Sequence, residues 1–509
     1  MRHTIEIKNG ITRHPLYRMN QPVDLLIDEG EQIAIVGPNG SGKSRLTDII
    51  VGRLPLLMNE VKYDFGSSPY KLVSDHVKFM SFRDSYGDND STYYYQQRWN
   101  QHDVDDSMPT VQELLEQAFQ ASLKSAGFGM NEDEVRRANE QKIQLKEKLY
   151  TLFHLDTLLD KKIIFLSSGE LRKFQLTRTL FADPRVLILD NPFIGLDSTT
   201  REQLKELLKL LIRDIGLQII LVLSRTDDIP DFITHVVPVE DLTVFPKISR
   251  SNYRAEWKDR NVENLSEKLQ TIIGNLPDCS GDEKQKDGDP VLVFNQVSIR
   301  YGQRAILKDL NWTVKKGEKW ALEGENGSGK STLLSLVCAD NPQAYACDIA
   351  LFGKKRGTGE SIWEIKKHIG YVSPEMHRAY LKDLPAIDIV ASGLNDSVGL
   401  YVKPKPEQRV TCEMWMDIFG IRHLADRTFL KLSSGEQRLC LLARAFVKDP
   451  DLLILDEPLH GLDCTNRKLV KDIITVFCRR PHKTLVMVSH YPEDLPEIIQ
   501  KHLVLHKIK

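Results

Sequence analysis

The chain has 509 residues, of which 41% are hydrophobic and 28% charged, and its formal net charge is −2 at pH 7. This composition predicts a globular protein of more than two units, and the balanced charge argues against broad binding to DNA or to an anionic membrane. Seven cysteines, the first of them Cys279 and none in a CxxC spacing, favour reduced thiols over disulfides or a metal framework.

The N-terminal region contains a glycine-rich loop that follows an apolar strand pattern at 33–36 and precedes a helical pattern. Residues 37–44 fit the Walker A pattern, in which backbone N–H groups and a helix N-terminus hold phosphates. The lysine reaches the β- and γ-phosphates, and the serine hydroxyl binds Mg²⁺. The predicted ATP-binding residues are Gly37, Pro38, Asn39, Gly40, Ser41, Gly42, Lys43 and Ser44, of which Ser44 is also a predicted Mg²⁺ ligand.

Residues 83–110 are rich in Tyr, Asp, Gln and Asn and are predicted to form a polar insertion. A serine-rich helix start follows at Ser167, Ser168 and Gly169, where serine caps leave backbone N–H groups and the helix dipole to meet a γ-phosphate. The insertion makes the first half longer than the second: Lys43 and Asp190 are 147 positions apart, and the equivalent pair farther along is 126 apart.

An apolar strand pattern at 187–189 delivers Asp190, a predicted Mg²⁺ ligand, to the end of a strand. Asn191 follows, and Arg225 comes after the next apolar strand. Asparagine cannot act as a base and arginine cannot shuttle a proton near neutral pH, so we expect this half to bind Mg-ATP and hydrolyse it slowly at best. The alternative is that other groups compensate.

The middle of the chain is predicted to be a linker. Residues 246–288 contain one possible helix at 261–273, followed by Ser-Gly and Asp-Gly pairs with mixed charge. The sequence therefore predicts a first domain at 1–245, a linker at 246–288 and a second domain at 289–509.

The second domain repeats the motifs of the first in the same order. The predicted ATP-binding residues of its Walker A loop are Gly324, Glu325, Asn326, Gly327, Ser328, Gly329, Lys330, Ser331 and Thr332, and those of its serine-rich helix start are Ser433, Ser434 and Gly435. Ser331 and Asp456 are the predicted Mg²⁺ ligands. Glu457 is predicted to orient or deprotonate the attacking water, and His490 to polarise the γ-phosphate and that water.

Walker A, LSSGE, Walker B and the following Gly-Leu-Asp, in this order in both halves, resemble the ABC-type ATPases. The resemblance implies an α/β fold of the P-loop NTPase class, with two tandem nucleotide-binding domains that each have a mixed sheet core and a helical subdomain. It also implies head-to-tail pairing, in which each ATP is held by one Walker A loop and the signature of the opposite domain. One composite site then contains Glu457 and His490, and the other contains Asn191 and Arg225.

Residues 369–377 and 392–401 resemble the second cassette of the ModF-type proteins, which are named for molybdate transport, and residues 224–232 resemble their first cassette. Tyr301 lies 23 positions before Gly324, where an ABC cassette stacks an aromatic ring on adenine; a core aromatic is the alternative. The gapless equivalent in the first half is His14.

The glutamine of most ABC cassettes is absent. The aligned positions hold Phe82 and Pro374, and Glu375, Gln96 or Gln97 are candidate substitutes. The run 93–99, rich in Tyr and Gln, is either a partner-docking surface or a packed loop.

The sequence thus favours a soluble, cytoplasmic ATPase that uses ATP and Mg²⁺. We expect it to lie at the inner face of the membrane and to be coupled to a permease in trans. A translation-associated ATPase of the ABC-F type, bound to the ribosome, is one alternative, although the linker is short and not strongly basic. A regulatory ATP sensor is the other. No secretory signal or membrane span is predicted.

Overall fold

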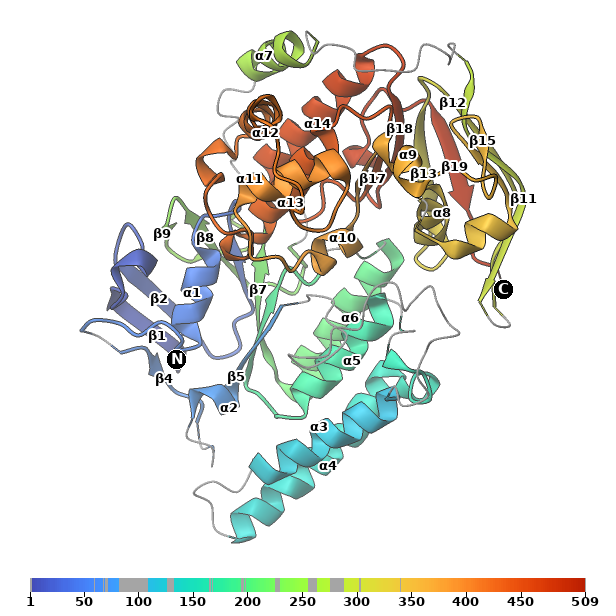
Figure 1. Ribbon diagram of the computed structural model, residues 1–509. Helices are drawn as coiled ribbons and strands as arrows, with labels where there is room; N and C mark the ends of the chain where they lie inside the picture. The colour runs from blue at the N-terminus through green and yellow to red at the C-terminus, as the bar shows by residue number, and fades with distance from the viewer. Residues whose placement is uncertain are drawn as a thin grey trace. The chain divides into compact units, whose positions relative to one another are not determined.

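The computed structural model describes residues 2–58, 60–66, 68, 72–81, 109–125, 132–163, 166, 168–193, 196, 198–224, 229–254, 263–274, 288–301, 304–338 and 340–508. The described residues up to 254 form one compact unit, and those from 263 onward form a second (Figure 1). Most of the predicted insertion at 83–110, including Gln96 and Gln97, lies outside the described residues, as do Phe82, Ser167 and Arg225.

The first unit is built on a sheet with a parallel centre, whose strand order is β10-β8-β3-β7-β6-β5. Its buried strands are short and apolar, as expected when helices cover both faces. The short strands β9 and β10 pair antiparallel with β8. The bounds are β3 Ile33–Val36, β5 Val77–Ser81, β6 Val186–Asp190, β7 Gln218–Leu223, β8 His235–Glu240, β9 Thr243–Val244 and β10 Ile248–Ser249.

The second unit repeats this arrangement. Its parallel sheet has the order β16-β17-β18-β13-β19, which matches β5-β6-β7-β3-β8 strand for strand. The bounds are β13 Lys319–Gly324, β16 Ile369–Val372, β17 Leu452–Asp456, β18 Thr484–Val488 and β19 Lys501–Leu505. The tandem duplication inferred from motifs is therefore also present in the strand topology.

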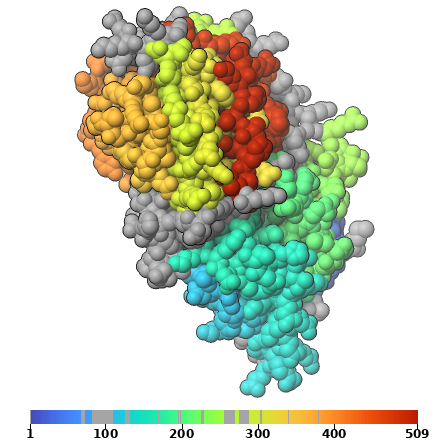
Figure 2. Space-filling model, turned by 90° about the vertical axis from the view of Figure 1, so that its right-hand side faces the viewer, coloured from blue at the N-terminus to red at the C-terminus, as the bar shows by residue number. Residues whose placement is uncertain are grey.

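Each unit carries a second, antiparallel sheet, with the order β2-β1-β4 in the first and β12-β11-β14-β15 in the second. Figure 2 shows the yellow-green strands β11 and β12 on the surface of the second unit. The bounds are β1 His3–Gly10, β2 Val23–Asp28, β4 Lys62–Tyr63, β11 Pro290–Tyr301, β12 Arg304–Lys315, β14 Asp348–Leu351 and β15 Lys354–Lys355.

Helices surround these sheets in both units. Those of the first are α1 Lys43–Ile50, α2 Val73–His76, α3 Val111–Ser125, α4 Glu132–Phe153, α5 Ser168–Leu180 and α6 Ser198–Ile215. Those of the second are α7 Glu263–Gly274, α8 Lys330–Val337, α9 Ile362–Lys367, α10 Pro374–Ala379, α11 Ala386–Ala391, α12 Pro406–Ile418, α13 Ser434–Phe446 and α14 Cys464–Arg479. α1 and α8 follow the Walker A loops, and α5 and α13 follow the serine-rich signatures.

A helical subdomain is present in each unit, as the resemblance implies. In the first, α3 and α4 lie side by side and project from the unit, where they appear in cyan in Figures 1 and 2. Lys146 of α4 donates to the Glu116 carboxylate of α3 at 2.5 Å, and Lys142 donates to the Ser122 carbonyl at 2.7 Å. In the second, α11 and α12 pack on α13 in one apolar core.

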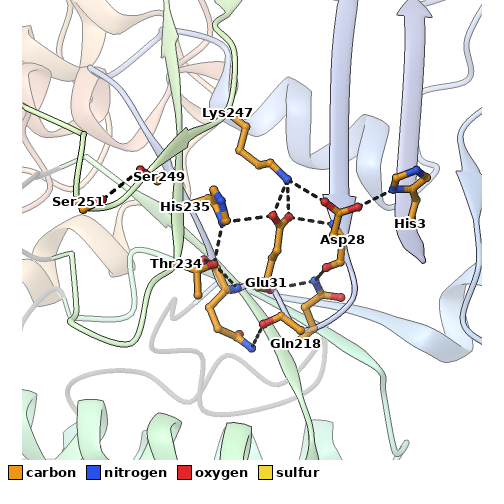
Figure 3. A network of polar contacts seen from close by, with 11 residues as sticks. His3, Asp28, Glu31, Gln218, Thr234, His235, Lys247, Ser249 and Ser251 are labelled. Atoms are coloured by element: carbon orange, nitrogen blue, oxygen red, sulfur yellow. Dashed lines mark hydrogen bonds and ion pairs between the residues drawn. The ribbon is translucent and has the colours of Figure 1, made fainter. Parts of the chain in front are cut away.

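The segment predicted as linker contains ordered elements of both units. Strand β10 pairs with β8, and Lys247 contacts Glu31 at 2.5 Å and Asp28 at 3.6 Å (Figure 3). Helix α7 packs on α14 and contributes Leu269 and Ile273 to the core of the second unit. Residues 246–254 therefore belong to the fold of the first unit, and 263–274 to that of the second. The sequence did not indicate this, because the polar composition of the segment is typical of a linker.

Candidate nucleotide-binding and hydrolysis sites

The two Walker A loops have the backbone geometry that phosphate binding needs. At Gly37 a Cβ atom would lie 2.0 Å from the Val239 carbonyl oxygen, and at Gly324 it would lie 2.4 Å from that of Leu505. Each loop therefore runs directly against the neighbouring strand, β8 or β19, and only glycine fits there. The loop glycine that precedes the helix, Gly42 in the first unit, has φ +107°.

Several polar groups of these loops either bind the backbone of their own loop or lack a partner in the protein. Lys43 Nζ donates to the carbonyls of Gly37 and Pro38, both at 2.7 Å, so its side chain curls over its own loop. Lys330 Nζ does the same with Gly324 at 2.5 Å and Glu325 at 3.0 Å. The hydroxyls of Ser41 and Ser328 are buried without a hydrogen-bond partner among the described residues. These features fit a bound polyphosphate, because a phosphate oxygen supplies the missing acceptors.

The Walker B aspartates lie at the same sheet edge as these loops. Asp190 and Asp456 are the last residues of β6 and β17, and each pairs with a residue of the strand beside the Walker A strand, Val222 or Val488. The carboxyl ends of parallel strands meet at one edge, so a carboxylate two strands along from the Walker A strand suits Mg²⁺ bound to phosphate.

Asn191 and Glu457 follow these aspartates with the same backbone conformation. Their φ angles are +47° and +50°, and their N–H groups donate to Val222 at 2.8 Å and Val488 at 3.0 Å. This positive-φ conformation is strained in both residues. The two residues therefore present different chemistry at one structural position.

Their side chains differ in how they are held. Asn191 Nδ2 donates to Asp190 Oδ1 at 2.9 Å, and Asn191 Oδ1 accepts from the Ser224 N–H at 3.0 Å. Glu457 Oε1 is buried, has no hydrogen-bond partner among the described residues, and lies 3.8 Å from His490 Nε2. The asparagine amide is thus engaged by the protein, whereas a glutamate oxygen is left for another group such as water.

Burial raises the pKa of Glu457 to about 8, and the charges of Asp456 and Asp494 act in the same direction. The His490 backbone N–H and the Arg438 guanidinium oppose this rise in the pKa. A carboxyl group with a pKa near neutrality suits a general base. A divalent cation beside Asp456 would favour the ionised form.

The signature helix of the second unit starts with a capping box. Ser433 Oγ accepts from the Glu436 N–H at 3.4 Å, and the Glu436 carboxylate accepts from the Ser433 N–H at 2.7 Å. This leaves Gly435 inside the first turn of α13. In the first unit, α5 starts at Ser168 and includes Gly169.

The predicted adenine contacts are placed differently in the two units. The Tyr301 hydroxyl accepts from Asn341 at 3.0 Å, and its ring packs on the core, so part of this residue is engaged structurally. His14 Nδ1 accepts from the Leu16 N–H at 3.3 Å, and its neighbour Tyr17 is 46% exposed.

The segment after β16 lacks the usual glutamine and instead starts helix α10, which is capped by Ser373 Oγ and begins with Pro374. Glu375 lies within α10. Sequence reasoning missed Arg438, a buried residue of α13 whose guanidinium reaches the carbonyl groups of Asp456 and Glu457. The signal in the sequence was a basic residue directly before the apolar run at 439–443 of α13.

Within the part of the chain that the structure describes, no helix is long and apolar enough to cross a membrane, and no group of three or more His, Cys, Asp or Glu side chains is arranged to hold a metal ion.

The sequence pattern of the ABC transporter family matches residues 20–194 and 307–460, one match in each unit. The chain belongs to the ABC transporter family. The ABC transporter ATP-binding protein ModF of Escherichia coli is 36% identical over 509 residues, which cover 98% of this chain and 96% of that protein. An uncharacterised ABC transporter ATP-binding protein of Schizosaccharomyces pombe is 29% identical and covers 96% of this chain and 94% of its own length.

Among solved structures, an archaeal ribosome recycling factor in complex with a ribosomal stalk protein has a similar fold. Its TM-score is 0.51 at 18% identity, and the match covers 97% of this chain and 87% of that chain. The tandem ABC ATPase of ModF type that the motifs predict is therefore confirmed, together with its P-loop α/β fold.

Proposed function

We propose that this ABC ATPase is an ATP-driven switch that binds two Mg-ATP between its cassettes and hydrolyses mainly the one at the second-domain Walker loop. The observation that carries the proposal is the difference between Glu457 and Asn191 at one backbone position. The glutamate has a buried oxygen for water, and the asparagine is tied to Asp190 and Ser224. One site then turns over while the other mostly holds its nucleotide.

The residues at each site have separate roles in this proposal. Lys43 and Lys330 neutralise phosphate charge, and the loop N–H groups orient it. Ser44 with Asp190, and Ser331 with Asp456, would hold Mg²⁺, which would neutralise negative charge on the phosphates. Glu457 takes the proton of the attacking water. His490 contacts the γ-phosphate from the adjacent strand end.

The signatures complete the sites from the opposite cassette. Ser433, Ser434 and Gly435 face the ATP of the first Walker A loop, and Ser167, Ser168 and Gly169 face that of the second. The first turn of a helix attracts the γ-phosphate, so ATP draws the cassettes together and hydrolysis releases them.

The chain acts at the cytoplasmic face of a membrane, where ATP-driven closure of the two cassettes drives a permease in trans. The similarity to ModF, a protein named as an ABC transporter ATP-binding protein, supports a transport-associated role. The cargo that we propose is a metal oxyanion, because the ModF-type proteins that the sequence resembles are named for molybdate transport. A translation-associated role is the second candidate, favoured only by the fold shared with the ribosome recycling factor. A regulatory ATP sensor is the third.

Turnover of the Glu457→Gln variant tests the catalytic assignment. We expect Mg-ATP binding to persist and steady-state hydrolysis to fall at least about a hundredfold. Asn191→Gln is the matched control at the same backbone position of the first unit, and we expect it to retain most of the parental turnover. Hydrolysis that survives Glu457→Gln would show that the base lies elsewhere.

Co-purification with the Glu457→Gln variant, which would hold ATP, tests the partner. The chain is recovered from cells in the presence of Mg-ATP, and membrane and ribosome fractions are compared with those of the parental chain. Enrichment of a membrane permease is the expected result. Enrichment of ribosomes would replace transport with the translation-associated role.

A further inference from the structure

A buried arginine connects the signature helix of the second unit to its catalytic segment. Arg438 lies on α13, is 2% exposed, and donates to four backbone carbonyl groups. The acceptors are Asp456 at 2.9 Å, Glu457 at 2.5 Å, Pro458 at 3.4 Å and Ser373 at 3.1 Å. One guanidinium therefore joins the chain after β17, the chain after β16, and α13.

The geometry of these contacts needs an arginine. A guanidinium presents five N–H donors in a rigid plane, and here all three of its nitrogens donate to carbonyls that come from two separate segments. A lysine would bring the same charge as one flexible ammonium group and could not span both segments in the same way. Burying this charge among carbonyl oxygens is tolerated only because the donors are satisfied.

The backbone of Glu457 is held from both sides. Its N–H donates to Val488 of β18, its carbonyl accepts from Arg438, and its φ of +50° is a strained conformation. A residue in such a conformation keeps it only while its surroundings impose it. The Glu457 carboxylate accepts a hydrogen bond from the His490 backbone N–H, but its Oε1 has no partner among the described residues, so the backbone of Glu457 helps to set where this oxygen lies.

Arg438 is also linked to the start of α13. It lies four residues after Ser434, which places both on one face of the helix, one turn apart. In the proposed function, Ser434 faces the ATP held by the first Walker A loop. A shift of the helix start upon ATP binding would therefore move the guanidinium that holds Glu457.

We propose that Arg438 is a positioning residue that couples the position of the signature helix to the position of the catalytic glutamate in the same cassette. ATP at the poorly hydrolysing site thereby sets the rate at the other site. This inference rests on the proposed sandwich of ATP between the cassettes and adds the residue that connects the two sites.

Arg444 provides a matched comparison on the same helix. It is equally buried, at 2% exposure, but donates to Ser392 at 3.1 Å and Asp396 at 2.9 Å, away from the catalytic segment. If substitution of Arg438 lowered turnover only by disturbing α13, substitution of Arg444 should therefore lower turnover equally.

The first experiment measures kcat and KM for ATP, with the melting temperature, in full-length Arg438→Lys, Arg438→Gln, Arg444→Lys and Arg444→Gln. We expect the Arg438 variants to lose at least about tenfold in kcat with KM within about twofold, because positioning of the base acts on the chemical step. The Arg444 variants should lose similar thermal stability and keep kcat within about threefold of the parent.

Either Arg438 variant decides the matter, since both lack the planar fork of donors. Equal kcat losses at the two arginines would overturn the proposal. Failure of both Arg438 variants to fold, while the Arg444 variants fold, would also overturn it, because Arg438 would then be a residue of general stability.

The second experiment is a double-mutant cycle between Lys43→Ala, which removes ATP from the first Walker A loop, and Arg438→Lys. We expect Lys43→Ala to lower turnover in the parental chain. In the Arg438→Lys background, the factor by which Lys43→Ala lowers turnover should be at least about threefold smaller. Equal factors in both backgrounds would overturn this inference alone. No effect of Lys43→Ala in the parent would instead overturn the proposed function.

Discussion

Asn191 and Glu457 occupy equivalent places in the two units, each following a Walker B aspartate with φ near +50° and each donating its N–H to the adjacent strand. The backbone that presents the Glu457 carboxylate in the second unit is thus also present in the first unit, although the carboxylate itself is missing there. The loss of hydrolysis that we propose there is therefore chemical rather than architectural, which makes it open to repair.

Restoration of the first site is the most direct test of this view. In a Glu457→Gln background we expect Asn191→Glu alone to stay inactive, because Arg225 cannot carry a proton. Asn191→Glu with Arg225→His should recover hydrolysis to a level at least about tenfold above that background. Single-turnover hydrolysis of radiolabelled ATP measures this, and Asn191→Gln with Arg225→His is the control. Activity of the control would contradict the prediction.

The stability of the nucleotide-free chain should depend on pH through Glu457. Burial raises its pKa to about 8 in the folded chain, whereas a glutamate in the unfolded chain has a pKa of about 4.3. Between these values the folded chain holds the extra proton, so the contribution of Glu457 to the free energy of unfolding falls as pH rises toward about 8.

Glu457→Gln removes this titration. We expect the variant to be more stable than the parent by a few kcal/mol at most near pH 8, and the difference to shrink toward pH 5. Urea unfolding of the metal-free chain across this range measures the difference. A constant offset would show that Glu457 does not titrate in this window.

Gly324 should tolerate no side chain. Its φ is +143° and a Cβ would lie 2.4 Å from the Leu505 carbonyl, so Gly324→Ala should cost about 2–3 kcal/mol of stability and abolish turnover. Gly353→Ala is the control, since its φ is +76° but no atom lies within 4 Å of the added Cβ. It should cost only about 1 kcal/mol and leave turnover intact. Denaturant unfolding and ATP turnover distinguish the two.

Lys247 tests whether the start of the predicted linker belongs to the first unit. Lys247→Met leaves the half-buried carboxylates of Glu31 and Asp28 without this partner, so we expect a loss of about 1–3 kcal/mol. Lys354→Met, which breaks an exposed pair with Glu364, should change stability by less than about 1 kcal/mol. Equal effects of the two variants in denaturant unfolding would place Lys247 outside the folded unit.

Much of the fold could be predicted from local motifs in the sequence. The Walker A loops, the apolar strands that end at Asp190 and Asp456, and the signature helix starts were all readable because each depends on residues that are neighbours in the chain. The mixed sheet and helical subdomain followed from the resemblance that these motifs support. Helix α13 starts at Ser434, five residues before the first apolar residue of its pattern, Leu439, because the capping box fixes the first turn.

Contacts between distant segments were not readable in this way. The sequence determined that Glu457 follows a strand and that Asn191 replaces it in the first half. Only the tertiary structure decided that Asn191 is tied to Ser224, that Lys247 joins Glu31, and that Arg438 reaches the glutamate backbone. The physical reason is that these bonds link residues from 19 to 216 positions apart, and such partners are chosen by burial and strand order, which no local pattern encodes.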